Sequence, residues 1–152
     1  MNEPNPLQLS AIEARLLGCL VEKESTTPEQ YPLTEHAAQL AANQKTSRDP
    51  VMALDAGTVA HALRGLEAKG LARRVDGARA LRFEHTAARA LELPRGQLAA
   101  LALLLLRGPQ TAAEVRARSE RMHAFRTVED VEDVLMSLAD RELTMLLERQ
   151  PG

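Results

Sequence analysis

The chain carries the same apolar pattern twice, and this repeat constrains its fold more than any single motif does. One block of five positions recurs at a constant offset: Leu9, Leu17, Leu20, Val21 and Thr27 match Leu93, Leu101, Leu104, Leu105 and Thr111. A second block recurs at a smaller constant offset: Val59, Leu63, Leu66 and Leu71 match Val131, Leu135, Leu138 and Leu143. The register changes by 12 between the blocks, which favours an extra loop in the first copy, most simply Gln44 to Leu54. A repeated order of this kind predicts two copies of one supersecondary unit.

Local signals give the order of elements within the first copy. Ser10 and Glu13 form a capping box for a first helix, and a second helix is expected after Thr34. Asp55 is a good N-cap for a third helix, which Gly70 ends. Two short strands follow, over residues 71–75 and 80–85, with Asp76-Gly77 as the turn between them.

Three helices followed by a two-stranded hairpin form the winged-helix plan. The second half repeats this order, with Thr111 and Thr127 as helix caps and a strand beginning at Leu143. Its last four residues, 149–152, have the composition of a turn with no returning strand. We therefore predict a mainly α fold with small β-hairpins (α+β), built as two tandem winged-helix domains over residues 1–90 and 91–152, the second wing being incomplete.

The composition excludes several classes of protein. The core must be aliphatic, because 45% of residues are hydrophobic but only 2% are aromatic. The single cysteine, Cys19, lies in an apolar helical run, so we interpret it as a buried small hydrophobe in a reducing compartment. No signal peptide is evident, and the apolar run from Leu98 to Leu106 is too short to cross a bilayer. These features predict a cytoplasmic protein without a membrane partner.

Basic residues gather around the third helix and the first wing. With Val59, Leu63 and Leu66 facing the core, helical geometry puts His61 and Arg64 on the opposite face. Residues 61–82 contain six cations against two anions, a local balance of +4 in a chain whose net charge is -2. Basic side chains on a helix and wing are typical of phosphate and base contact. The candidate nucleic-acid-binding residues are His61, Arg64, Arg73, Arg74, Arg79 and Arg82, joined by Lys45 and Arg48 of the extra loop.

The charge pattern of the second half differs from that of the first. Its third helix begins with Glu129, Asp130, Glu132 and Asp133, which repel a phosphate backbone. A more basic stretch precedes this helix and is interpreted as an interdomain, partner or anion-binding surface; its candidate interface residues are Arg116, Arg118, Arg121, Met122 and His123.

Nothing in the sequence predicts catalysis, a metal or a cofactor. The four histidines, His36, His61, His85 and His123, are dispersed and none has a partner at metal-ligand spacing. No glycine-rich phosphate loop or nucleophile elbow occurs. We expect a protein that is not an enzyme.

Three long segments resemble a known family. The stretches LSAIEARLLGCLVEKESTTPEQYPL, NQKTSRDPVMALD and LLLLRGPQTAAEVRARSERMHAF are similar to the YceH-like family of uncharacterised bacterial proteins. The resemblance covers nearly all of residues 9–150 and implies tandem winged helices, without implying an activity. Members of that family continue past the final Pro-Gly, which favours a shortened form here.

Two functions remain open at this point. The leading hypothesis is a DNA-binding, transcription-regulator-like protein that pairs as a homodimer and contacts double-stranded DNA through its first domain. The alternative is a protein–protein interaction module in which both winged helices bind partner chains. Equal numbers of basic and acidic residues in positions 1–90, 11 of each, favour the alternative.

Overall fold

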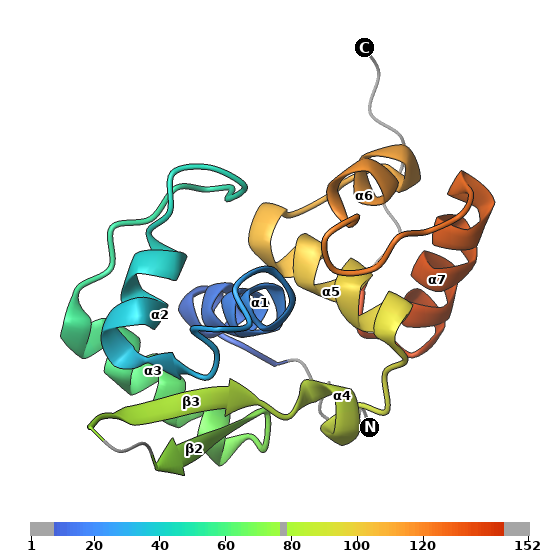
Figure 1. Cartoon of the computed structure of the whole chain (residues 1–152). Helices are drawn as coiled ribbons and strands as arrows, with labels where there is room; N and C mark the ends of the chain where they lie inside the picture. The colour runs from blue at the N-terminus through green and yellow to red at the C-terminus, as the bar shows by residue number, and fades with distance from the viewer. Residues whose placement is uncertain (1–7, 77–78, 145–152) are drawn as a thin grey trace.

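The computed structural model describes residues 8–76 and 79–144 and shows a mainly helical protein with a small three-stranded antiparallel sheet (Figure 1). The predicted fold class is therefore confirmed, while the tandem winged-helix interpretation stays a prediction. In chain order the elements are α1 (Ala11–Thr26), β1 (Leu33–Thr34), α2 (Glu35–Ala42), α3 (Ala56–Ala68), β2 (Ala72–Asp76), β3 (Leu81–His85), α4 (Ala87–Ala90), α5 (Arg95–Arg107), α6 (Ala112–Arg118) and α7 (Val128–Asp140).

Helix starts follow the local capping signals. Ser10 and Glu13 form a reciprocal capping box at α1, with backbone N–H to side-chain oxygen distances of 2.9 and 3.0 Å. The Asp55 carboxylate accepts from the Thr58 N–H at 2.7 Å and caps α3. The caps of α2, α6 and α7 are likewise the threonines that precede them. These starts are predictable because a cap needs only residues within one turn.

The sheet has the strand order β1-β3-β2, with both pairs antiparallel. The hairpin of β2 and β3 was predicted, and its turn residues 77 and 78 lie outside the described residues. Strand β1 was not predicted. It is very short, and it exists because Leu33 pairs with Phe83 of β3, which is far away in the sequence. Phe83 is 1% exposed and anchors the centre of the sheet in the core.

The helical repeat appears directly in the element bounds. Helix α1 starts at Ala11 and α5 at Arg95, and the spacing between these starts equals the spacing of the first repeated block of the sequence. Likewise, the first residues of α3 and α7, and also their last residues, are separated by the spacing of the second repeated block. The expected single extra loop is wrong, because the additional residues of the first half are spread over α1, the α1–α2 link, α2 and the α2–α3 link, each of which is longer than its counterpart. The match of Thr27 to Thr111 is also wrong, since Thr27 ends α1 whereas Thr111 caps α6.

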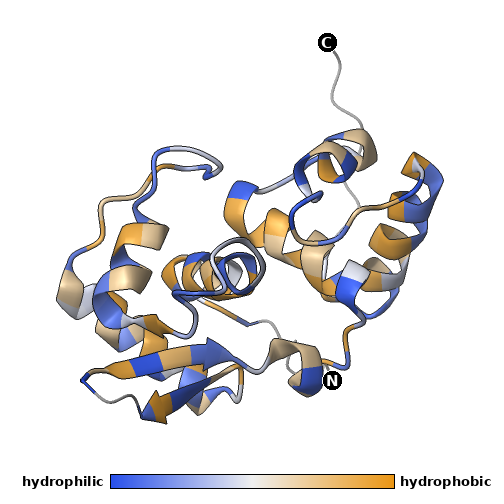
Figure 2. Ribbon diagram, in the orientation of Figure 1, coloured by the Kyte–Doolittle hydropathy of each residue, from blue (hydrophilic) through white to orange (hydrophobic). Residues whose placement is uncertain are grey.

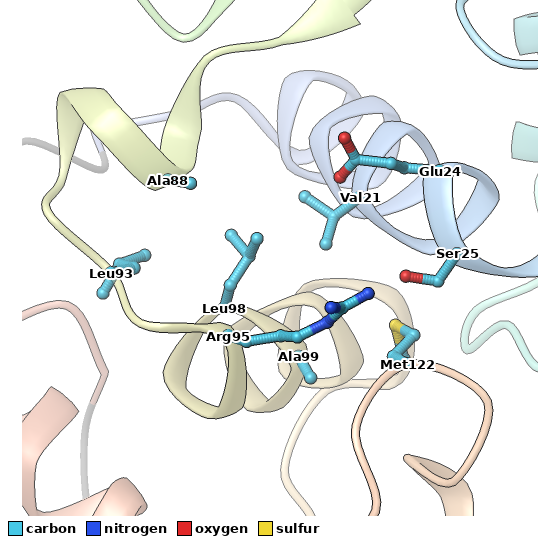
Figure 3. A pocket seen from close by; sticks show the side chains of 9 residues that line it. All are labelled: Val21, Glu24, Ser25, Ala88, Leu93, Arg95, Leu98, Ala99 and Met122. Atoms are coloured by element: carbon cyan, nitrogen blue, oxygen red, sulfur yellow. The ribbon is translucent and has the colours of Figure 1, made fainter. Parts of the chain in front are cut away.

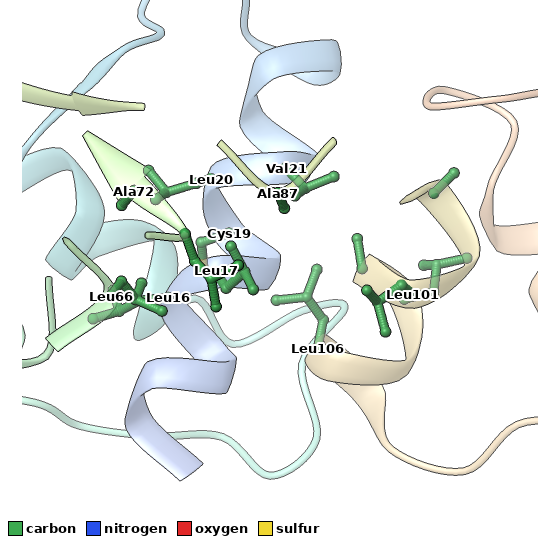
Figure 4. Close-up of a cluster of buried hydrophobic side chains, with 14 of the residues drawn as sticks. Leu16, Leu17, Cys19, Leu20, Val21, Leu66, Ala72, Ala87, Leu101 and Leu106 are labelled. Atoms are coloured by element: carbon green, nitrogen blue, oxygen red, sulfur yellow. The ribbon is translucent and has the colours of Figure 1, made fainter. Parts of the chain in front are cut away.

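The two halves share one core. Helix α1 lies against α5 at the centre of the molecule, and their buried side chains meet there (Figures 1 and 4). A glycine permits this approach: a Cβ at Gly18 would lie 2.8 Å from Cγ of Leu106, which is itself fully buried. Figure 2 shows apolar residues along both helices. The division at residues 90 and 91 stays a prediction, because the buried cluster continues through both halves.

The final part of the second half is described only as far as residue 144. Leu143 lies in a bend after α7, and the rest of the predicted strand falls outside the described residues. Within the described ranges, no single helix is long and apolar enough to cross a membrane. Helices α5 and α6 taken together have the length and apolar composition of a membrane span, but the chain bends by 101° between them.

Candidate nucleic-acid interface

Helix α3 presents a small, partly basic face to solvent. Its buried stripe is Val59, Leu63 and Leu66, each with no exposed surface, and this stripe faces α1 and α2. The opposite face holds Gly57, His61, Arg64 and Ala68, all of which are exposed. The prediction from helical geometry therefore matches the observed exposure of this helix. In the described part of the chain, neither His61 nor Arg64 makes a side-chain hydrogen bond or ion pair.

The hairpin next to α3 carries three exposed arginines. Nη2 of Arg73 lies 3.0 Å from a carboxylate oxygen of Glu84 on the neighbouring strand. Nε of Arg74 lies 2.9 Å from both oxygens of Glu67 on α3. Arg79, at the tip of the hairpin, is exposed and has no partner among the described residues. Arginine charge is thus present along the hairpin, but part of it is already neutralised by carboxylates.

The charge that is left for a ligand is smaller than the sequence count indicates. Lys69 is engaged with Glu13, with 2.5 Å between Nζ and Oε1, in addition to the two arginine pairs on the hairpin. Desolvation raises the pKa of the Glu13 carboxyl, but hydrogen bonds from Lys69 and Ser10 outweigh it and hold this pKa below its usual value. Of the six cations in residues 61–82, Arg64, Arg79 and Arg82 have no carboxylate partner in the described ranges.

Arg82 has a positioning role on the three-stranded sheet. Its Nη1 donates to the carbonyl oxygens of Pro32 at 2.9 Å and Gln30 at 3.3 Å, so it ties β3 to the link that follows α1. Its charge is not cancelled by an anion, but the side chain is half-buried and directed at the protein backbone.

Arg48 does not belong to any nucleic-acid interface, and that prediction is corrected. Its side chain has no exposed surface, and its guanidinium donates to both carboxylate oxygens of Glu22, at 2.7 and 3.1 Å, and to the Ala41 carbonyl at 3.1 Å. A phosphate cannot reach it. Lys45 is exposed, yet its segment, residues 43–55, lies at the far end of the first half from the hairpin and bonds to α5 through Asp49 and Leu106 (Figure 1).

The candidate interface residues of the second half mostly stabilise a loop. Arg116 donates to the carbonyls of Phe125 at 3.3 Å and Arg126 at 2.9 Å, which fixes the link between α6 and α7. Arg118 is held by Glu114 and Gln110. Met122 is 8% exposed and borders a cavity together with residues of α1, which agrees with the interdomain alternative and leaves little of its surface for a partner chain.

Two of these residues join the halves of the molecule or stack within the link. Nη2 of Arg121 donates to the Thr26 carbonyl at the end of α1, at 3.1 Å. His123 packs its ring edge-on against Phe125, with 4.7 Å between ring centres. Arg121 therefore supports the predicted interdomain role, on a surface shared by α1 and the α6–α7 link.

Sequence reasoning missed the polar residues that organise the first half from inside. Arg15, on α1, is 1% exposed and donates to the carbonyls of Ala42, at 2.8 Å, and Pro50. Burial lowers the pKa of its guanidinium. Tyr31 and Glu24 both hold His85 at the end of β3. The helical period alone was the available signal: it places Arg15 next to Leu16 and Cys19 on a mainly buried helix.

The described residues offer no grouping of three or more His, Cys, Asp or Glu side chains fit to hold a metal ion. Among the described residues, the surface of α3 and the hairpin keeps a helix face with small residues and the unpaired Arg64, and next to it a basic hairpin with the unpaired Arg79. Such a surface can contact an extended anionic polymer.

Comparison with known proteins places the chain in a family. The family model described as "Protein of unknown function, DUF480" matches residues 9–152, so the chain belongs to this family of uncharacterised bacterial proteins. A UPF0502 protein of Stenotrophomonas maltophilia is 56% identical over 98% of this chain and 69% of its own length. A UPF0502 protein of Pseudomonas aeruginosa is 56% identical over 95% of this chain and 65% of its own length. A UPF0502 protein of Xanthomonas campestris is 53% identical over 98% of this chain and 67% of its own length.

Proposed function

We propose that this chain is a winged-helix, transcription-regulator-like protein that binds double-stranded DNA through α3 and the β2–β3 hairpin. The observation that carries the proposal is the exposed face of α3. Arg64 and His61 stand on it without intramolecular partners among the described residues, between the small residues Gly57 and Ala68. Small flanking residues let a helix approach the floor of a groove, and arginine is the side chain that most often recognises guanine there.

The order of elements supports the same proposal. A winged helix places its third helix at the groove and its hairpin beside it, on the phosphate backbone. Here α3 leads directly into β2, and the exposed arginines of the hairpin continue the surface of the helix. The link between α2 and α3, residues 43–55, is longer than the turn of a simple helix-turn-helix, but it folds toward α5 and leaves the exposed face of α3 open.

The second half of the chain differs from the first in the charge of its corresponding helix. Helix α7, the counterpart of α3, exposes Glu129, Asp130, Glu132 and Asp133. Because these carboxylates repel phosphate, one chain makes a single DNA contact, and a homodimer in the cytoplasm supplies two.

Fluorescence anisotropy with mixed genomic DNA fragments at low salt tests the proposal. The variant Arg64→Ala/Arg79→Ala is expected to bind more weakly at every salt concentration. Each lost phosphate contact should reduce the slope of log affinity against log salt by about 1. Arg89→Ala, which removes an exposed arginine of α4, is the matched control and should bind like the parent chain. Absence of DNA binding, or equal binding by the parent and the double variant, would overturn the proposal.

A second candidate is the protein-interaction module, and one observation favours it. Leu40 on α2 and Val51 in the α2–α3 link are large apolar side chains that are 61% and 57% exposed, and a protein partner could bury them. The two candidates differ in a simple measurement. A protein partner should co-purify in fixed stoichiometry after nuclease treatment and be lost on Leu40→Ser, whereas DNA binding should be unaffected by that change.

A further inference from the structure

A cavity of about 390 Å³ lies where the two halves of the chain meet (Figure 3). Its walls come from the last turns of α1, from α4, from the first turns of α5 and from Met122 of the α6–α7 link. The volume falls in the range of about 300–1,000 Å³ that is typical of small-molecule sites. It lies outside the surface of α3 and the hairpin, so nothing in the proposed function uses it.

The cavity is lined by apolar and polar groups in similar measure, with two opposite charges at its border. The apolar side chains include Val21, Leu93, Leu98 and Met122. Glu24 borders the cavity from α1, and Arg95 extends into it from α5, toward Ser25 (Figure 3). No ion pair joins Glu24 to Arg95 in the described part of the chain. A cation and an anion therefore border one partly apolar cavity without neutralising each other.

Both charges stand at helix ends where they disfavour the fold. Arg95 is the first residue of α5, where the partial positive charge of the helix disfavours a cation, and no acidic residue of that turn compensates it. Glu24 lies near the C-terminal end of α1, where an anion is disfavoured in the same way. Arg95, which breaks this rule without an acidic residue in the same turn, is therefore a candidate for function.

Glu24 is held in place from behind by His85. The Ala87 N–H donates to Nδ1 of His85 at 3.2 Å, and Nε2 of the same ring lies 2.8 Å from Oε1 of Glu24, within hydrogen-bond distance. This contact fixes the carboxylate and leaves Oε2 open to a ligand donor. His85 therefore positions Glu24 at the border of the cavity.

We propose that the cavity binds a free α-amino acid with an apolar side chain. Its carboxylate would pair with Arg95, since a guanidinium is the best side-chain partner of a carboxylate. Its ammonium group would donate to Glu24, and its side chain would lie on Val21, Leu98 and Met122. One small zwitterion thus satisfies both charges and the apolar lining together, and the inference does not depend on DNA binding.

Isothermal titration calorimetry with L-leucine and L-methionine tests the site on the whole chain. Three comparison compounds each lack one recognised group: 4-methylpentanoate has no ammonium, 3-methylbutylamine has no carboxylate, and glycine has no apolar side chain. Each is expected to bind about tenfold or more weakly than L-leucine, because each leaves a charge or the apolar lining without a partner. Equal binding of 4-methylpentanoate and L-leucine would overturn the zwitterion assignment.

Variants locate the ligand on the structure. Arg95→Ala and Glu24→Gln should each weaken L-leucine binding about tenfold or more, whereas Arg89→Ala on neighbouring α4 should leave it unchanged. Glu24→Gln keeps an oxygen that accepts from His85, and Arg95 is exposed, so both variants are expected to fold; melting temperatures without ligand check this. Among the four histidines, the ring resonances of His85 should move most on titration with L-leucine. No binding by the parent chain up to millimolar concentration, or unchanged binding by Arg95→Ala, would overturn the proposal.

Discussion

Two buried guanidinium groups, those of Arg15 and Arg48, hold residues 43–55 against α1. Arg15 reaches the carbonyls of Ala42, which precedes this segment, and Pro50 within it, and Arg48 closes the ion pair to Glu22. A buried guanidinium without hydrogen bonds is costly, so the position of the segment is determined by these contacts. Arg48, which the sequence analysis gives as a candidate nucleic-acid-binding residue, is thus part of the interior.

The Glu22–Arg48 pair makes stability depend on pH. Burial raises the pKa of the Glu22 carboxyl, but the hydrogen bonds and charge of Arg48 outweigh it and hold the pKa below its usual value. The pair therefore stabilises the fold fully above the unfolded pKa of about 4.3 and loses this contribution as the pH falls through the folded value.

Glu22→Gln is expected to lower the free energy of unfolding at pH 7 by about 3 kcal/mol, because it leaves a buried Arg48 charge without its partner. Urea unfolding at pH 7 and at successively lower pH measures this difference, which should shrink as the parent carboxyl becomes protonated. Glu29→Gln, at an exposed position, is the control, with an expected change within about 0.5 kcal/mol. A difference that stays constant down to pH 3 would contradict the assigned role.

The reactivity of the Cys19 thiol reports whether the buried face of α1 is accessible to solvent. Its thiol has no exposed surface, and burial raises its pKa to about 11. Since the thiolate is the reactive form, Ellman's reagent at pH 8 should leave the folded protein unmodified and should label one thiol per chain in denaturant. Rapid stoichiometric labelling of the folded chain would show that this part of α1 is open to solvent.

At the scale of elements, predictability from sequence follows the distance between partners. The caps and bounds of α1, α3 and α7 were predictable, because their signals lie within one or two turns. Strand β1 was not, since its residues become a strand only when β3 lies beside them. The burial of Arg48 was missed for the same reason, because its partner Glu22 lies 26 positions away.

The candidate site divides in the same way. The exposed face of α3 was predictable, since periodicity alone identifies the side opposite Val59 and Leu63. The pairing of Arg73 with Glu84 and of Arg74 with Glu67 was not, because it depends on strand register and on how β2 passes α3. The cavity around Arg95 and Glu24 required the packing of α1 on α5, which no local pattern contains.

The contact of α1 with α5 gives the prediction at this scale. Gly18→Ala places a methyl group 2.8 Å from Leu106 Cγ and 3.3 Å from the Ala102 carbonyl oxygen, so the buried Leu106 side chain or α5 itself must shift. We expect a loss of about 1–3 kcal/mol from overpacking, although alanine favours a helix by about 1 kcal/mol.

Gly57→Ala near the start of α3 is the matched control for this change. Its nearest neighbour, Oδ1 of Asp55, would be at an ordinary 3.6 Å, so the substitution should be neutral or slightly stabilising. Thermal unfolding of both variants compares the two sites. A Gly18→Ala chain as stable as the parent would show that the helices are less closely packed than described.

At the scale of the whole molecule, the shared core predicts that the two halves unfold together. Leu106 lies on α5, packs beside Gly18 of α1, and accepts a backbone hydrogen bond from Asp49 through its carbonyl oxygen. It is therefore placed where both halves and residues 43–55 meet. Two domains with separate cores would instead unfold in two steps.

Leu106→Ala is expected to cost about 2–5 kcal/mol, because it opens a cavity in the shared core. Hydrogen exchange measured by mass spectrometry reports on the first half through peptides of α3 and on the second half through peptides of α7. The substituted residue lies in neither helix, so a change in either one reflects stability at a distance from the substitution. Protection should fall by a similar factor in both, since one cooperative unit loses stability as a whole. Leu40→Ala, at an exposed position of α2, is the control and should change neither. A loss of protection in α7 alone would mean that residues 91–144 unfold independently. The two halves would then be separate domains that do not unfold as one cooperative unit.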